Sequence, residues 1–282
     1  MTKTYQRILN KKSYFPPADW LKIKTIDMHT GGEPLRVIVD GFPKLEGNNV
    51  LEYRNFVKEN HDHLRCALMH EPRGHADMYG CILTPPNDED GDFGILFLHN
   101  EGYSTMCGHA IIAITKLAVE MGWVEKVSPE TVVKIDAPCG RITAFAKIEN
   151  EEVESVYFHC VPSFVVALDQ QVEVPNLGII NYDLAYGGAF YAYVDATNLG
   201  LELTPENYRL LIQKGMDIKR AVMASSDLVK HPFEEDLSFL YGTIFIGGPV
   251  SDGIDSRNVC IFAEGEVDRC CLLYTSPSPR DS

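Results

Sequence analysis

Short apolar segments grouped around single helical patterns constrain the fold of this chain more than any other feature. Apolar residues spaced three and four apart predict helices over 51–69 and 108–121. Around these helices, turn residues such as those at 30–34 and 85–88 separate short segments typical of strands. The predicted strands cover residues 23–28, 35–40, 79–83, 94–98, 131–135, 141–148 and 153–159.

The same order of elements begins again after a break at residues 161–165. A helix is predicted over about 205–224, and strands are predicted near Val172 and over 189–194, 237–246 and 258–263. Strands grouped around single helices favour an α+β fold over strict alternation of strand and helix. No sequence repeat is visible, so the similarity of the two halves rests on the order of elements alone.

The length of 282 residues fits about two domains. The N-terminal segment is polar and is broken by Pro16-Pro17. We therefore predict a loose leader over 1–22, a first α/β half over 23–165, a second half over 166–269 and a separate tail over 270–282.

Acidic residues outnumber basic ones, 40 against 25, which gives a formal net charge of −15. Such a chain repels phosphate backbones and anionic lipid surfaces, and its basic residues are scattered, so we expect neither nucleic acid nor a membrane as a partner. No stretch approaches the ~18 apolar residues of a membrane span, and residues 1–7 lack the apolar core of a signal peptide. We expect a cytoplasmic protein.

The eight cysteines are spread through the whole chain. Without a secretory signal we expect reduced thiols rather than a disulfide framework. The sequence has no Cys-x-x-Cys pair and no His-Glu-x-x-His helix, which argues against a metal site. It has no glycine-rich phosphate loop of the dinucleotide or P-loop type either.

The sharpest local feature is the segment 100–109, which ends in Cys107-Gly108-His109 where the second predicted helix starts. A cysteine there meets unpaired N–H groups and the positive end of the helix dipole, which lower the pKa of its thiol. Gly108 permits close approach of a ligand, and the N–H groups of the first turn suit a carboxylate. The plain alternative, that Cys107 is one more buried thiol, stays open on local sequence alone.

Three further segments place polar side chains at the ends of predicted strands, namely 27–36, 71–80 and Asp268-Arg269. Each has a plain interpretation too, because Gly-Gly forms turns and charges at strand ends are commonly solvated. We interpret His29 and His75 as structural hydrogen-bonding residues.

Taken together, these segments resemble the proline racemase family. The resemblance extends from about residue 23 to residue 269, and the sequences of the motifs are closer to those of the family's trans-3-hydroxy-L-proline dehydratases than to those of its racemases. It rests on seven segments in the same order: 27–36, 71–80, 96–109, 161–165, 185–191, 235–243 and 258–269.

The resemblance implies two similar α/β halves of the diaminopimelate-epimerase-like type, with the active site in the cleft between them and no cofactor. Cys107 matches the family's first catalytic cysteine, which is the base that removes the Cα proton. Gly108 and His109 match substrate-binding positions. Asp268 matches an aspartate that contacts the ring nitrogen of the substrate.

The implied reaction is dehydration of trans-3-hydroxy-L-proline to a pyrroline-2-carboxylate, because a hydroxyl at C3 can leave as water once the Cα proton is removed. Without that leaving group, reprotonation from the other face makes a proline racemase or a 4-hydroxyproline epimerase, and this alternative stays open. An inactive fragment that still binds a prolyl ligand is a third alternative. The implied partner is a small amino acid, and a homodimer is compatible with the resemblance.

The sequence departs from the family's pattern directly after Asp268-Arg269. There the family has Ser-Pro, then Cys in racemases and epimerases or Thr in dehydratases, and then Gly. We interpret residues 271–281 as a translated sequencing adapter, which leaves the second half incomplete and its second catalytic position unknown. Neither Cys270 nor Cys271 takes that position, and a native Ser/Pro-rich tail is the alternative.

Overall fold

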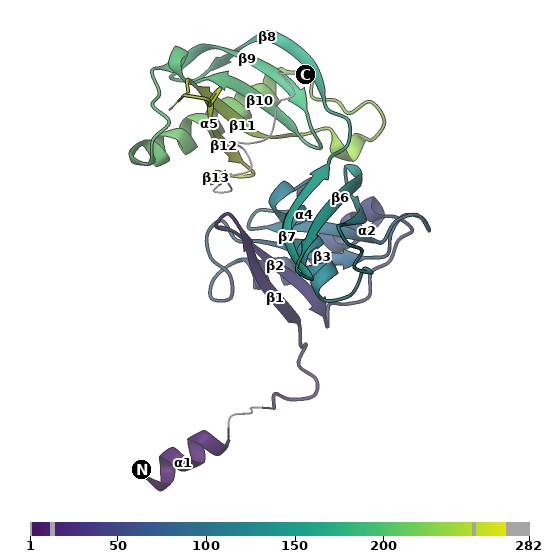
Figure 1. The fold of residues 1–282 in the computed structure, drawn as a ribbon. Helices are drawn as coiled ribbons and strands as arrows, with labels where there is room; N and C mark the ends of the chain where they lie inside the picture. The colour runs from purple at the N-terminus through teal and green to yellow at the C-terminus, as the bar shows by residue number, and fades with distance from the viewer. Residues whose placement is uncertain (1, 12–14, 250–251, 269–282) are drawn as a thin grey trace.

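Two β-sheets form the two halves of the molecule, and they lie one above the other in Figure 1. The computed structural model describes residues 2–11, 15–249 and 252–268. Within those ranges the first sheet has seven strands in sequence order, β1 to β7, and the second has six, in the order β13-β12-β11-β10-β9-β8. The predicted α+β fold with two similar halves is confirmed.

Each half combines its sheet with a small number of helices. The first half contains β1 (Lys24–Thr30), β2 (Glu33–Asp40), α2 (Val50–Asn60), α3 (Asp62–Met69), β3 (Tyr79–Thr84), β4 (Phe93–His99), α4 (Gly108–Glu120), β5 (Glu130–Ala137), β6 (Gly140–Glu149) and β7 (Glu152–His159). The second contains β8 (Phe164–Val174), β9 (Gly178–Tyr186), β10 (Phe190–Asp195), α5 (Tyr208–Ser225), β11 (Leu240–Gly247), β12 (Arg257–Phe262) and β13 (Glu266–Val267). Short 3₁₀ helices lie at Thr197–Leu199, Pro205–Asn207 and Glu235–Leu237.

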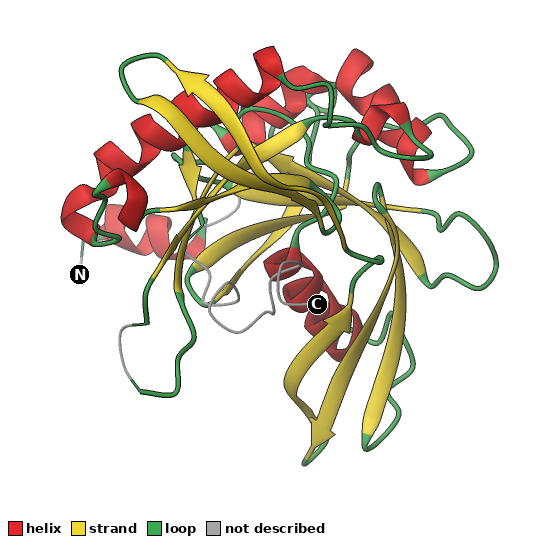
Figure 2. Ribbon diagram, turned by 90° about the horizontal axis from the view of Figure 1, so that it is seen from above, coloured by secondary structure: helices red, strands yellow, loops and turns green. Residues whose placement is uncertain are grey.

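Parallel strand pairs occur where helices connect the two strands. β2 pairs with β3 across α2 and α3, β4 pairs with β5 across α4, and β10 pairs with β11 across α5. Parallel strands need such crossovers, because a tight turn can join only antiparallel neighbours. The helices therefore lie along the faces of the sheets rather than in line with the strands (Figure 2).

The helix α4 is the centre of the first half, because its sequence is apolar along almost its whole length. Ile111, Ile114 and Leu117 are buried in the core that it shares with the first sheet. The same buried cluster continues into the second half through Tyr241 and Phe262. The core therefore crosses the boundary between the halves.

Hydrogen bonds also join the two halves directly. Thr105 Oγ1 donates to the carbonyl oxygen of Gly188 at 2.6 Å, and Asn55 Nδ2 donates to Asp236 Oδ2 at 2.7 Å. Residues 160–163 connect the two sheets along the chain. The loop that precedes α4 is consequently held by both halves.

The prediction of one helix over 51–69 is wrong, because the chain forms α2 and α3 with a break at His61. His61 has φ −131°, outside the helical region. Its ring packs edge-on against Phe42 and Phe56, at 5.9 and 5.5 Å between ring centres. This tertiary packing holds the break, and apolar spacing along the sequence cannot reveal it.

Three strands of the second sheet differ from prediction. The sequence analysis includes neither the short strand β13 nor β9, although Ile180, Tyr182 and Leu184 alternate with the polar Asn181 and Asp183 along β9. The strand predicted over 237–246 begins only at Leu240, since the preceding residues form a 3₁₀ helix.

The leader, predicted to be loose, contains the helix α1 (Lys3–Asn10). Thr2 caps this helix by accepting a hydrogen bond from the backbone N–H of Tyr5 at 3.3 Å. No residue of α1 is buried, and it stands apart from both halves in Figure 1. None of the helices within the described ranges has the length and apolar character needed to cross a membrane. Arg269 and the tail 270–282 lie outside the described residues.

Gly188 is expected to be the residue whose replacement most disturbs the contact between the halves. It has φ +92°, and an added Cβ would lie 2.7 Å from Met106 Cβ. Gly188→Ala therefore combines backbone strain with a steric clash, and we expect it to lower the free energy of unfolding by about 3 kcal/mol in urea titrations. Gly200→Ala is the control, because φ is +61° there and no atom lies within 4 Å of the added Cβ. Its expected cost is about 1 kcal/mol, and equal losses for the two variants would contradict the proposed clash.

Candidate active site

The loop between β4 and α4 is fixed by buried polar contacts. The side chain of Asn100 donates to the carbonyl oxygens of Met69 at 2.9 Å and His75 at 3.0 Å. Arg65 is paired with Asp62 at 2.7 Å and donates in turn to the carbonyl oxygen of Asn100. Because each of these polar groups has a partner, the loop reaches α4 in one conformation.

Cys107 is the residue that immediately precedes α4, with an extended backbone at φ −151° and ψ 106°. Its side chain is 7% exposed and belongs to the buried cluster that joins the two halves. The sulfur lies 3.2 Å from His109 Nδ1. It is also hydrogen-bonded to the backbone N–H of Ala110 and to the hydroxyl of Tyr79.

Burial raises the pKa of the Cys107 thiol well above its ordinary value. The hydrogen bonds from Ala110 and Tyr79 act in the opposite direction, and the charges of Asp268 and Glu33 raise the pKa further. The prediction of a lowered pKa at the helix start is therefore wrong, because desolvation outweighs the helix dipole at this buried position. Forming the thiolate requires a neighbouring base.

His109 lies in the first turn of α4 and is suited to be that base. Its Nε2 is 3.2 Å from the carbonyl oxygen of Pro34, and a carbonyl can only accept a hydrogen bond. The proton therefore belongs on Nε2, which leaves Nδ1 as an acceptor facing the thiol of Cys107. Thr30 Oγ1 donates to the carbonyl oxygen of His109 at 2.9 Å and fixes this turn against the β1–β2 hairpin.

Gly108 and Asp268 reach the same region from different halves. Gly108 is the first residue of α4, beside Cys107. Asp268 follows β13, and its N–H donates to the carbonyl oxygen of Cys260 at 3.2 Å. Its charge acts on the thiols of both Cys107 and Cys260. The structure thus places Cys107, Gly108 and His109 together at the start of α4, and the charge of Asp268 acts on the Cys107 thiol from the second half.

The segments 27–36 and 71–80 are tied to each other by Arg36. This side chain pairs with Asp27 at 2.7 Å, and the hydrogen bond lowers the pKa of the Asp27 carboxyl group. Arg36 Nη1 also donates to the carbonyl oxygen of Arg73 at 2.8 Å. These charged residues therefore support the site rather than face a ligand.

Sequence analysis does not identify the hydroxyl groups beside Cys107. Tyr79 is buried, and its hydroxyl is hydrogen-bonded to Ser104 Oγ and lies near the hydroxyl of Tyr241 from the second half. The ring of Tyr79 packs edge-on against His109, with ring centres 4.9 Å apart. Tyr79, Ser104 and Tyr241 all lie within segments that carry the family resemblance, namely 71–80, 96–109 and 235–243. Their position in these segments is the one sequence signal that points to them.

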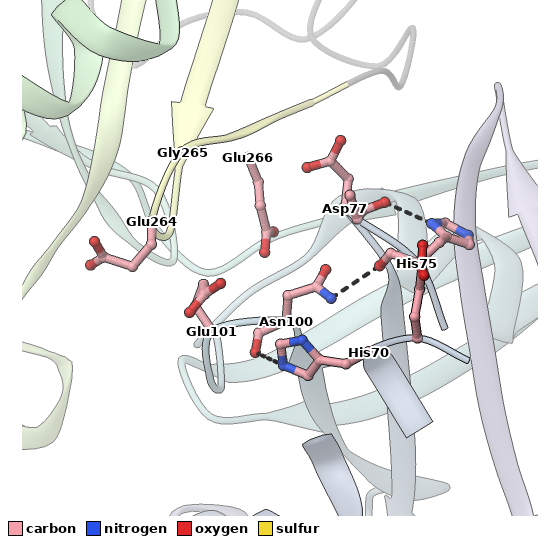
Figure 3. A pocket seen from close by; sticks show the side chains of 10 residues that line it. His70, His75, Asp77, Asn100, Glu101, Glu264, Gly265 and Glu266 are labelled. Carbon is pink, nitrogen blue, oxygen red and sulfur yellow. Dashed lines mark hydrogen bonds between the residues drawn. The ribbon is translucent and has the colours of Figure 1, made fainter. Parts of the chain in front are cut away.

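A cavity of about 500 Å³ lies next to this site, between the two halves (Figure 3). Glu266 of the second half faces Asn100 and Glu101 of the first half across it. Glu266 is 5% exposed, and its Oε1 lies 3.6 Å from His99 Nδ1. The cavity does not include Cys107, and its many carboxylates disfavour an anionic group. Its lining residues are His70, Glu71, His75, Ala76, Asp77, Asn100, Glu101, Glu264, Gly265 and Glu266.

No metal site is evident in the described part of the chain. Over residues 2–11, 15–249 and 252–268, the structure contains no group of three or more His, Cys, Asp or Glu side chains arranged to hold a metal ion.

Comparison with known proteins gives consistent results. The family model described as proline racemase matches residues 25–272. A trans-3-hydroxy-L-proline dehydratase from Colwellia psychrerythraea is 52% identical over 273 residues, which cover 95% of this chain and 77% of that protein. A trans-L-3-hydroxyproline dehydratase from Xenopus tropicalis is 48% identical over 256 residues, covering 90% and 73%.

A solved structure shares the fold. It is a hydroxyproline epimerase from Agrobacterium vitis with bound trans-4-hydroxy-L-proline, 32% identical, with a TM-score of 0.81. The similarity covers 88% of this chain and 72% of that one.

The thiols are expected to react with iodoacetamide in an order set by their surroundings. A hydrogen bond from Cys139 lowers the pKa of the half-buried Cys160, whereas burial raises the pKa values of Cys107 and Cys81. Near neutral pH, Cys160 should therefore be labelled before Cys107, and Cys107 should react faster as pH rises. Peptide mass spectrometry measures each rate, with the fully buried Cys81 as the unlabelled control. Labelling of Cys107 as fast as Cys160 near neutral pH would contradict the stated effect of burial.

Proposed function

The chain belongs to the proline racemase family, and on that premise we propose that it is a cofactor-independent hydro-lyase that converts trans-3-hydroxy-L-proline to a pyrroline-2-carboxylate. The observation that carries the proposal is the contact of 3.2 Å between Cys107 Sγ and His109 Nδ1 at the start of α4. The charge of Asp268 acts on the same sulfur from the second half.

The first step is removal of the Cα proton by Cys107. His109 Nδ1 accepts the thiol proton, which produces a thiolate beside an imidazolium, as in other cysteine–histidine pairs. A proton α to a carboxylate is a poor acid, so the thiolate must act in a site that excludes water. Cys107 meets this condition because it is buried between the two halves.

The second requirement is stabilisation of the charge that moves onto the substrate carboxylate. The first-turn N–H groups of α4, at Gly108 and His109, lie at the positive end of the helix and suit this anion. Asp268 would pair with the protonated ring nitrogen at the opposite end of the amino acid. Together these contacts orient Cα toward Cys107.

The third step is loss of the C3 hydroxyl. The electron pair released at Cα forms a double bond to C3, and the C3–O bond breaks with departure of water. The enamine formed is a tautomer of the cyclic imine, so the product is a pyrroline-2-carboxylate. No redox change takes place and no cofactor is required.

An epimerase acting on hydroxyproline is the second candidate, because it would use the same proton abstraction. The named dehydratases are 52% and 48% identical to this chain, whereas a 3-hydroxyproline 2-epimerase from Burkholderia multivorans is 45% identical and the solved epimerase is 32% identical. The two highest of these four identities belong to dehydratases, and the epimerase stays the second candidate. The second catalytic position follows Asp268 and lies outside the described residues.

We also propose that the protein acts in the cytoplasm on the free amino acid. We propose in addition that it assembles as a homodimer, and light scattering can measure its mass in solution.

Turnover of trans-3-hydroxy-L-proline in deuterated water tests the proposal. We expect a pyrroline-2-carboxylate, detected by nuclear magnetic resonance, and a rate at least about 10³-fold lower in Cys107→Ser, because serine is a far weaker base. Cys160→Ser is the matched control, since Cys160 is a half-buried thiol whose Sγ donates to the carbonyl oxygen of Gly187 at 3.8 Å, and it should retain activity. Inversion at Cα with deuterium uptake and no loss of water would support the epimerase instead.

A further inference from the structure

A cluster of buried hydroxyl groups lies directly beside the Cys107 thiol. The Tyr79 hydroxyl is hydrogen-bonded to Cys107 Sγ and to Ser104 Oγ. Tyr241 from β11 in the second half brings its buried hydroxyl to the same place. The Tyr79 hydroxyl favours the Cys107 thiolate, but this one effect does not account for three clustered hydroxyl groups, so a further role is to be sought for them.

Dehydration makes a demand that racemisation does not make. Hydroxide is a poor leaving group, and an acid that protonates the departing oxygen accelerates such a step. In trans-3-hydroxy-L-proline the carboxylate and the C3 hydroxyl are on opposite faces of the ring. The Cα hydrogen is therefore on the same face as the hydroxyl, and the acid has to stand on the side of the ring from which the base approaches.

We propose that Tyr79 is the catalytic acid that protonates the departing C3 hydroxyl, an assignment that rests on the proposed dehydration. Its ring packs edge-on against His109, with ring centres 4.9 Å apart, and His109 Nδ1 lies 3.2 Å from Cys107 Sγ. The Tyr79 hydroxyl, which also acts on the Cys107 thiol, therefore stands beside the base. Tyr79 is 2% exposed, which keeps bulk water from replacing it as the proton donor.

Proton transfer between these two side chains closes the cycle. The thiolate of Cys107 takes the Cα proton, the released electron pair forms the Cα=C3 bond, and the C3–O bond breaks with its pair on oxygen. Tyr79 gives its proton to that oxygen, which leaves as water. The Cys107 thiol then returns its proton to the Tyr79 phenolate across their hydrogen bond. Substrate becomes enamine and water, and both side chains are restored.

Other groups at the site are less suited to this role. His109 Nε2 is directed at the carbonyl oxygen of Pro34, and its Nδ1 faces the thiol. Burial raises the pKa of Tyr79 well above its ordinary value, so this hydroxyl remains protonated through the neutral range. Ser104 and Tyr241 lie next to Tyr79 and can stabilise the transient phenolate by hydrogen bonding.

Tyr79→Phe separates the acid from the base, because it removes only the hydroxyl. In deuterated water we expect the rate of water loss from trans-3-hydroxy-L-proline to fall about 10²-fold or more. The rate of exchange of the Cα hydrogen should fall by no more than about tenfold, which is the effect of losing one hydrogen bond to the thiolate. Recovered substrate should therefore carry deuterium at Cα, whereas the unchanged chain mainly forms product.

Tyr186→Phe is the matched control, because Tyr186 is equally buried but belongs to the core of the second half. It should leave both rates unchanged, and near-ultraviolet circular dichroism checks that each variant is folded. Dehydration by Tyr79→Phe at the original rate would overturn the assignment. Loss of exchange and dehydration in equal proportion would also overturn it, because Tyr79 would then only support Cys107. Absence of both reactions in the unchanged chain would refute the proposed function itself.

Discussion

Burial of the Cys107 thiol between the two halves is the constraint on which the rest of the site depends. A buried thiolate loses the stabilisation of water, so its formation must be offset by hydrogen bonds from the protein. The N–H of Ala110 and the hydroxyl of Tyr79 supply such bonds, and His109 supplies a base. A helix start alone does not make this cysteine reactive, because its reactivity also depends on the Tyr79 hydroxyl from β3 and on the His109 side chain.

Sequence patterns predict the two halves and the start of α4 because these features are local. Apolar spacing sets the register of α4, and glycine beside Cys107 marks its first turn. The break at His61 depends on packing of its ring against Phe42, which lies outside the helical pattern, as well as against Phe56 of α2, so the same spacing fails there. A pattern along the sequence records which face of an element is buried, but it does not record what packs against that face.

The candidate site shows the same division between local and tertiary information. Cys107, Gly108 and His109 are adjacent in sequence and could be singled out together. Tyr79 lies in β3, almost thirty residues earlier in the chain, and only the fold brings it to this site. The sequence does not distinguish Ser104 from other loop residues, because its importance comes from the hydrogen bond with the Tyr79 hydroxyl. The sign of the Cys107 pKa shift also required the fold, because desolvation is a property of the assembled halves.

The charges around Cys107 suggest how an amino-acid substrate would activate the thiol. The carboxylates of Asp268 and Glu33 raise its pKa. If Asp268 pairs with the ring nitrogen, as proposed, the bound ammonium group offsets that negative charge, whereas the substrate carboxylate meets the positive end of α4. A zwitterion then matches the site at both ends, and its binding favours the thiolate. A simple anion would add to the negative charge near the sulfur, so the same layout that binds an amino acid selects against a carboxylate without an amine.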